Sequence, residues 1–144
     1  MGGTCQVDFY VLASPAQSAH QLACRLAMMA WEQGHRVAVL TSDEGEAESL
    51  DELMWDYPAG RFLPHQHGTS PASSPICIDV SGADISPDRE VVINLADAAV
   101  SDPSRFRRLL EIVPGEEPKR LASRTKFREY REQGLNPASH PIGK

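Results

Sequence analysis

Three arginines and one phenylalanine near the carboxyl end of the chain have the spacing of one helix face. At about 100° of rotation per residue, Arg124 lies about 40° and Arg131 about 20° from Arg120. Phe127 falls about 20° from Arg120 on the other side, so one aromatic ring lies among three guanidinium groups. An arginine can hold a carboxylate through two parallel hydrogen bonds, and an exposed ring between such groups can bury an apolar side chain. This face therefore predicts a binding site for an acidic peptide with a hydrophobic end.

The basic side chains of the chain are concentrated in its last third. Residues 1–104 hold 4 basic and 15 acidic side chains, whereas residues 105–144 hold 10 basic and 5 acidic ones, and the formal net charge is −6. An acidic body with one basic end repels free nucleic acid over most of its surface and attracts anions at one place. We therefore expect no general DNA binding, and we interpret Arg105, Arg107 and Arg108 as an ordinary solvated charge run.

The sequence lacks the glycines and spaced ligands of the common cofactor sites. The turn at Ala13–Ala16, after the first apolar run, contains neither G-x-G-x-x-G nor G-x-x-x-x-G-K-[ST], so it is not a phosphate-binding loop. His65 and His67 have no second spaced pair of metal ligands, and solvated loop histidines are more common. We therefore expect no cofactor and no metal.

The serines and acids of the chain also lack the partners that catalysis would need. The serines that follow strands, Ser14, Ser42 and Ser81, lie in no G-x-S-x-G elbow. The acids between Asp43 and Glu48 suit a solvated helix start better than a metal or acid-base site. We expect no catalytic residue and interpret the protein as a non-enzyme.

Strand patterns and helix patterns alternate along the chain, which predicts the elements that must position the arginine face. Expected strands cover residues 7–12, 36–41, 76–80, 91–95 and 110–113. Expected helices cover 16–33, a segment through 55 that Ser42 and Asp43 can N-cap, a short stretch from 103, and 116–134. Gly34 and Gly134 are placed to end two of these helices, and Gly60 to Pro75 is expected to be a loop. Because the strands are apolar without strict alternation, we predict a three-layer α/β domain with a mostly parallel central sheet covered by helices on both faces.

The length and composition suit one cytoplasmic domain. The chain has 144 residues, of which 41% are hydrophobic. Met1–Gln6 lacks the start of a secretion signal, and no apolar stretch approaches the roughly 20 residues that span a bilayer. Cys5, Cys24 and Cys77 are odd in number and form no C-x-x-C pair, so we interpret them as reduced packing residues.

A second segment gathers large apolar groups at a helix end and in the loop beyond it. Leu50–Trp55 is followed by Pro58, Phe62 and Pro64. Trp55 and Phe62 can close the core, which is the usual role of aromatic residues. Aromatic side chains near a proline-rich loop are also typical anchors of a protein interface. The residues alone leave both interpretations open.

Several motifs recur in an order that covers most of the chain. They are D-F-Y-V-L at residues 8–12, H-Q-L-A-C-R-L with A-W-E-Q-G-H-R-V at 20–37, L-D-E-L-M-W-D-Y-P with F-L-P-H at 50–65, I-V-P at 112–114 and F-R-E-Y-R-E-Q-G-L-N at 127–136. Their order and spacing resemble the chi subunit family of the bacterial DNA polymerase III holoenzyme, a clamp-loader accessory protein. At Phe127 familiar members carry tyrosine, so the ring is kept and the hydroxyl is lost. After Asn136 the chain no longer follows the pattern, and we expect residues 137–144 to be a flexible tail.

The resemblance implies a Rossmann-like fold and a non-catalytic bridging role. One surface of the family binds the psi subunit, which ties chi to the clamp loader, and another binds the acidic, phenylalanine-ended C-terminal tail of single-stranded DNA-binding protein. By position, the tail-binding residues correspond to Val113, Arg120, Arg124, Phe127, Arg128 and Arg131. The psi-binding residues correspond to Trp55, Pro58, Phe62 and Pro64. In the family the psi surface also accepts a helicase-like protein, and contact with nucleic acid is expected to be indirect.

Two other functions compete with this expectation. A small α/β enzyme could bind a phosphorylated or nucleotide substrate, with the arginines of the last helix around the phosphate. The basic helix could also bind single-stranded DNA directly, although it lacks the several stacking aromatic residues of such surfaces.

Overall fold

The computed structural model describes residues 5–57, 65–67, 74–82, 85 and 88–142. In this part of the chain, seven strands form one sheet in the order β3-β4-β2-β5-β6-β1-β7, and every strand pair is parallel. The strands are β1 (Gln6–Leu12), β2 (Val37–Thr41), β3 (His65–His67), β4 (Ile76–Val80), β5 (Val91–Asn94), β6 (Arg108–Val113) and β7 (Ala138–Ile142). The helices are α1 (Ala19–Glu32), α2 (Glu44–Asp56) and α3 (Glu117–Glu132), with one 3-10 turn, η1 (Pro103–Arg105).

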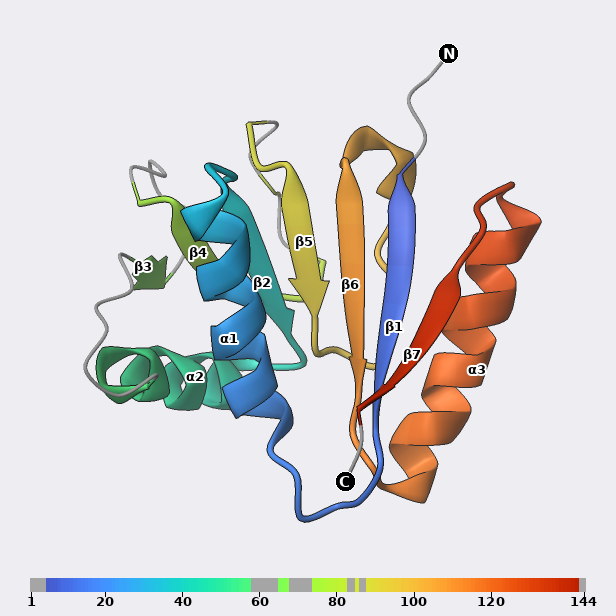
Figure 1. Cartoon of the computed structure of the whole chain (residues 1–144), viewed down its shortest axis with the longest axis horizontal. Helices are drawn as coiled ribbons and strands as arrows, with labels where there is room; N and C mark the ends of the chain where they lie inside the picture. Colours follow the sequence, from blue (N-terminus) through green and yellow to red (C-terminus); the bar gives the residue numbers. More distant parts are fainter. Residues whose placement is uncertain (1–4, 58–64, 68–73, 83–84, 86–87, 143–144) are drawn as a thin grey trace.

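Helices cover both faces of the sheet (Figure 1). α1 and α2 pack on one face, where Leu26, Leu50 and Ile93 belong to one buried cluster. α3 packs on the opposite face, behind β7 in Figure 1, where Phe9 and Tyr130 belong to a second cluster. Alternate residues of a strand point to opposite faces, so β1 and β6 contribute to both clusters. The predicted three-layer α/β fold with a parallel central sheet is confirmed.

The ends of the helices follow from the residues that flank them. The side chains of Ser18 and Asp43 accept hydrogen bonds from the first turns of α1 and α2, which is the N-cap arrangement. Pro118 lies in the first turn of α3, where a missing N–H costs nothing. Gly34 and Gly134 each adopt a φ of 90° just after α1 and α3, so they end these helices as predicted.

A strand stands near the carboxyl end, which corrects our expectation of a flexible tail for the described part of residues 137–144; residues 143–144 lie outside the described residues. Ala138–Ile142 form β7 at the edge of the sheet, parallel to β1. The Asp8 carboxylate and the His140 imidazole lie 2.8 Å apart, and the Tyr10 ring stacks on His140 with 5.3 Å between centroids. The side chains of β7 are mostly exposed and its sequence, A-S-H-P-I, mixes polar and apolar residues, so this strand lacks the apolar run by which the others were predicted.

Three further elements differ from expectation. The short helix expected from residue 103 is only the 3-10 turn η1. α1 begins at Ala19 rather than Ala16, because the Gln17 side chain accepts hydrogen bonds from two preceding backbone N–H groups and closes a turn there. His65–His67, expected within a loop, form β3 and pair with β4. Residues 60–64 and 68–73 of that expected loop lie outside the described residues.

Candidate functional site

A groove with a volume of about 710 Å³ lies between α3 and the sheet. Its sheet side is formed by Phe9 and Val11 of β1, Val113 of β6 and Ser139 of β7. All six residues predicted for the tail-binding site line this groove, namely Val113, Arg120, Arg124, Phe127, Arg128 and Arg131. The structure therefore brings the whole predicted set together. Ser139 could not be included from sequence, because β7 was not recognised as a strand.

The floor of the groove is aromatic. The Phe127 ring, which is partly exposed, packs against Phe9 with 5.2 Å between centroids and a tilt of 49°. Phe9 is buried, and its other side meets Tyr130 at 6.0 Å. Tilted aromatic pairs at these distances are favourable beyond simple burial of area. Phe127 is thus held from below while one side of its ring remains open to a ligand.

The arginines of the groove differ in the hydrogen bonds and ion pairs that they form within the protein. Arg120 donates to the Leu12 and Ala13 carbonyl oxygens at 3.1 and 3.4 Å, so it is partly committed to the end of β1. Arg124 lies 3.9 Å from Glu117, and both side chains are about two-thirds exposed, so this ion pair is weak. Among the described residues, Arg128 and Arg131 make no ion pair. Three guanidinium groups are therefore available to an anion.

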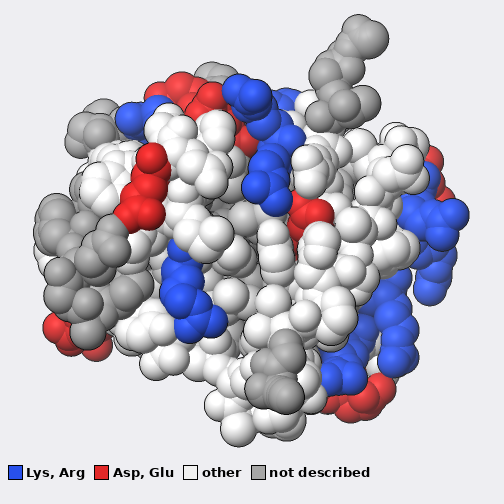
Figure 2. Space-filling model, viewed as in Figure 1, with Lys and Arg blue, Asp and Glu red and all other residues white. Residues whose placement is uncertain are grey.

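The charge of this region is visible on the surface. Figure 2 shows basic side chains gathered along the edge of the molecule that α3 forms. Only 5 of the 20 acidic residues of the sequence lie in residues 105–144, and one of them, Glu132, lines the groove. An anionic ligand would therefore be drawn to this edge.

The turn after β1, where a phosphate-binding loop would lie in a nucleotide-binding α/β protein, packs closely on the segment after β6. A Cβ atom on Gly115 would come within 2.4 Å of the Ser14 carbonyl carbon, so the segment after β6 packs directly on the turn after β1. The hydrogen bonds from Arg120 to Leu12 and Ala13 close the same turn. This packing, with the missing glycines, argues against nucleotide binding at that turn.

A buried polar network lies beneath α3, and sequence analysis missed it. The Glu111 carboxylate on β6 lies 2.6 Å from both Lys126 Nζ and the Tyr130 hydroxyl oxygen, and it also accepts from Asn94 Nδ2 at 2.9 Å. Lys126 Nζ donates to the Ala96 carbonyl oxygen as well, at 2.8 Å. Burial and the Glu111 charge raise the pKa of Tyr130, so its hydroxyl stays protonated and donates to the carboxylate. The signal in the sequence was Glu111, a charged residue within the apolar run of β6.

The second predicted surface is described only in part. The Trp55 side chain is 58% exposed, so it does not close the core. Its ring packs on the buried His65 ring with 4.6 Å between centroids, and His65 Nε2 lies 3.2 Å from the Asp51 carboxylate. The other predicted psi-binding residues, Pro58, Phe62 and Pro64, lie outside the described residues. An exposed and supported indole at this position has the form of an interface anchor.

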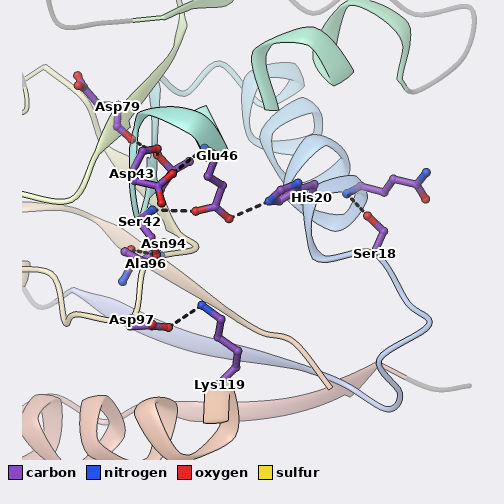
Figure 3. Close-up of polar contacts among 12 residues, drawn as sticks. Ser18, His20, Ser42, Asp43, Glu46, Asp79, Asn94, Ala96, Asp97 and Lys119 are labelled. Carbon is purple, nitrogen blue, oxygen red and sulfur yellow. Dashed lines mark hydrogen bonds and ion pairs between the residues drawn. The ribbon is translucent and has the colours of Figure 1, made fainter. Parts of the chain in front are cut away.

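Polar side chains also gather where the strands end (Figure 3). His20 Nε2 lies 2.8 Å from Glu46, whose other carboxylate oxygen accepts the Ser42 N–H at 2.7 Å. Burial opposes the charge on Glu46, but these two hydrogen bonds outweigh it and lower the pKa of the carboxyl. Lys119 of α3 pairs with Asp97 at 2.9 Å. These contacts join neighbouring elements, and the described residues contain no group of three side chains that could hold a metal ion.

The three cysteines are free and buried, as predicted. Burial raises the pKa of Cys5 to about 11 and that of Cys24 to about 12, so both thiols stay protonated. They are packing residues. Within the described residues, no helix has the length and apolar character needed to cross a bilayer.

One protein family matches the chain along almost its whole length. The model of the family described as "DNA polymerase III chi subunit, HolC" matches residues 5–138. The chain belongs to this chi subunit family. Members from Pseudomonas aeruginosa and Escherichia coli K12 are both named DNA polymerase III subunit chi. The first is 38% identical over 95% of this chain and 96% of its own length. The second is 31% identical over 83% of this chain and 82% of its own length.

Solved structures share the fold of this chi family member at much lower identity. The structure of T4 UvsW matches with a TM-score of 0.70 at 6% identity, and that of S. cerevisiae Dbp5 bound to RNA and ADP BeF3 matches with 0.67 at 11%. The matches cover 96% and 98% of this chain, which spans 41% and 42% of those chains. At these identities the likeness establishes the α/β fold alone.

Proposed function

We propose that this chain is a non-catalytic adaptor that joins the psi subunit of the clamp loader to the acidic C-terminal tail of single-stranded DNA-binding protein. The observation that carries the proposal is the groove beside α3, which combines an aromatic floor with arginines at its rim. Membership of the chi family gives the setting, which is DNA polymerase III. The chain would then act in the cytoplasm, where bacterial replication takes place, and would meet DNA only through its partner.

The tail would bind through two kinds of contact. Its terminal phenylalanine side chain packs on the open side of Phe127 and against Val113. Arg124, Arg128 and Arg131 hold the carboxylates of the tail. Because these guanidinium groups form at most a weak ion pair with the described part of the chain, a ligand need not displace a strong partner to reach them.

The psi subunit, or a helicase-like protein in its place, would bind at the Trp55 surface. The exposed indole, held by the buried His65 ring, is a rigid apolar anchor of the kind that carries much of the energy of a protein interface. Pro58, Phe62 and Pro64 are proposed to extend this surface. Trp55 belongs to α2, and the groove belongs to α3 and β1, so the two partners would not compete.

The proposal is tested by calorimetric titration of the protein with three short peptides. The first is acidic and ends in phenylalanine, the second has that phenylalanine replaced by alanine, and the third keeps the phenylalanine but carries amides in place of side-chain carboxylates. We expect saturable binding of the first, and clearly weaker binding of the other two. Affinity for the first should fall as salt rises, with an apolar remainder that resists salt. Equal binding of all three peptides, or of none, would exclude the groove as a tail site.

The competing enzyme hypothesis makes a different prediction for the same protein. Micromolar binding of a nucleotide or of a phosphorylated compound, with changes at Ser14 or Ser42, would support it. The close packing of Gly115 on the Ser14 turn weighs against that result. Direct binding to naked single-stranded DNA in a mobility-shift assay would instead favour the third hypothesis.

A further inference from the structure

α3 carries the rim of the groove, yet its buried face is mainly polar. The helix buries Ser123, Lys126 and Tyr130, and its one large exposed apolar residue is Leu121. A helix that rests on a sheet usually buries an apolar stripe, whose position sets the rotation of the helix. The apolar contacts of α3 come mainly from two rings against Phe9, those of the buried Tyr130 and the partly buried Phe127, so apolar burial prefers one rotation less strongly than a full stripe would.

We propose that the buried network of Glu111, Lys126, Tyr130 and Asn94 sets the rotation and position of α3, and thereby holds the groove arginines in place. This inference rests on the proposed function of the groove, which it deepens. The four residues are positioning residues, because none of them lines the groove.

The geometry of the network supports this role because its bonds converge on α3 from two directions. Glu111 is fully buried on β6, and its carboxylate accepts hydrogen bonds of 2.6 Å from both Lys126 and Tyr130 of α3. The segment after β5 holds the same two side chains, since Lys126 donates to the Ala96 carbonyl oxygen and Tyr130 accepts the Val100 N–H at 2.9 Å. Two side chains one turn apart, each bound to both β6 and this segment, fix rotation about the helix axis and sliding along it.

The groove face is adjacent to this locked face on the helix. At about 100° per residue, Lys126 and Tyr130 lie about 240° and about 280° from Arg120, whereas Phe127 lies at about 340° and Arg124 at about 40°. A rotation of a few tens of degrees would move the ring and the guanidinium groups off the floor formed by Phe9. Because a ligand gains affinity from groups already in place, such a rotation would weaken binding.

A buried ion pair is weak evidence for stability, since well-packed apolar residues often replace one without loss. Replacing the pair by apolar residues can therefore test its effect on the position of α3 without a large loss of stability. The test variant is Glu111→Leu with Lys126→Met. It removes both charges together, so no buried charge is left unpaired and the net charge of the protein stays the same. The matched control is Asp97→Leu with Lys119→Met, which removes an exposed pair between α3 and the segment after β5.

Peptide affinity is the first measurement, and thermal unfolding accompanies it. We expect the test variant to stay folded and to bind the acidic phenylalanine-ended peptide at least tenfold more weakly, and the control variant to bind like the parent. Parent-like affinity in a folded test variant would overturn the inference. If the test variant does not fold, Tyr130→Phe takes its place with the same criterion, because it removes one bond of the network and keeps the Glu111–Lys126 ion pair.

A second measurement needs no peptide, so it separates this inference from the proposed function. Spin labels at Gln21→Cys on α1 and Thr125→Cys on α3 report the position of α3, since both sites are exposed and the native cysteines are buried. We expect the distance distribution to shift or broaden in the test variant and not in the control. An unchanged distribution would refute the positioning role even if the parent binds the peptide. A parent that binds no peptide would refute the proposed function, while a shifted distribution would still support the role of the network.

Discussion

The two edges of the sheet differ in the surface that each presents, and therefore in the kind of partner that we propose for each. At the β7 edge, α3 holds arginines over an aromatic floor, next to a buried ion pair. At the β3 edge, α2 ends in the exposed indole of Trp55 on the His65 ring. The charged groove suits a flexible acidic chain end, whereas the apolar anchor suits a structured partner. One sheet can therefore offer two unlike sites that need not interfere.

The sheet also keeps the two sites apart. β3 and β7 are the outermost strands of the seven. With a strand spacing of about 4.8 Å, six intervals separate them by about 29 Å. Two partners held at this separation stay close enough to raise their mutual local concentration, which is the benefit of an adaptor.

The largest expected effect is on the free energy of unfolding, and it tests how much stability depends on the buried Lys126–Glu111 ion pair at the groove edge. Lys126→Ala leaves the Glu111 carboxylate buried without its main partner, which should lower the free energy of unfolding by about 3–5 kcal/mol. Lys119→Ala breaks an ion pair between exposed groups and should cost less than about 1 kcal/mol. Chemical denaturation of both variants measures the difference. Equal losses of stability in the two variants would show that the buried Glu111 pair contributes no more to stability than the exposed pair.

The next effect concerns the apolar edge. Trp55→Ala should weaken capture of the psi subunit by about 2–4 kcal/mol, which is the range of interface hot spots. Affinity for the acidic peptide should remain that of the parent. Co-purification with psi and calorimetry with the peptide measure the two sites in one variant. Loss of both partners from a folded variant would contradict the independence of the two edges.

An effect of comparable size is expected in the groove, but here peptide binding is lost and psi capture is kept. Arg124→Ala removes a charged donor and should weaken peptide binding by about 1.5–3 kcal/mol, roughly tenfold to 150-fold. Psi capture should not change. Lys119→Ala is the control, because it removes one positive charge from α3 outside the groove. If both variants lose the same affinity, net charge and not the groove would be responsible.

The smallest effect is a pH dependence at the groove edge. Burial opposes the charge on Asp8, but hydrogen bonds from Arg108 and His140 outweigh it and lower the pKa of the carboxyl. A group with a lowered folded pKa adds stability above its unfolded value, about pH 4, and loses it as pH falls through the folded value. Stability should therefore decline below about pH 4 in the parent. The decline should be shallower in Asp8→Asn, and identical curves from acid denaturation would show that the carboxylate adds nothing.

The sequence predicted those parts of the fold that depend on local pattern. The apolar runs defined β1, β2, β4 and β5, and the caps Ser42–Asp43 and the glycines after α1 and α3 marked helix ends. The strand order could not be predicted, because it depends on which helix covers which face. β7 was missed because it is a short, mostly exposed edge strand that mixes polar and apolar residues and contains a proline, so no apolar run marks it in the sequence.

The candidate site divides in the same way. The arginine and phenylalanine stripe could be predicted because helical spacing alone places Arg124, Phe127 and Arg131 together. The partners of Glu111 could not, since they come from β5 and α3, and only the folded chain brings them together. Lys126 belongs to the basic run in the sequence, but in the structure it is buried and is not part of the basic surface.

Binding of an acidic, phenylalanine-ended peptide at the groove is tested most directly by a nuclear magnetic resonance titration with per-residue assignment. We predict saturable shifts concentrated at Phe9, Val113, Phe127 and the groove arginines, with no change at Trp55. Shifts centred on Trp55 or on the Ser14 turn, or the absence of any saturable change, would contradict the account.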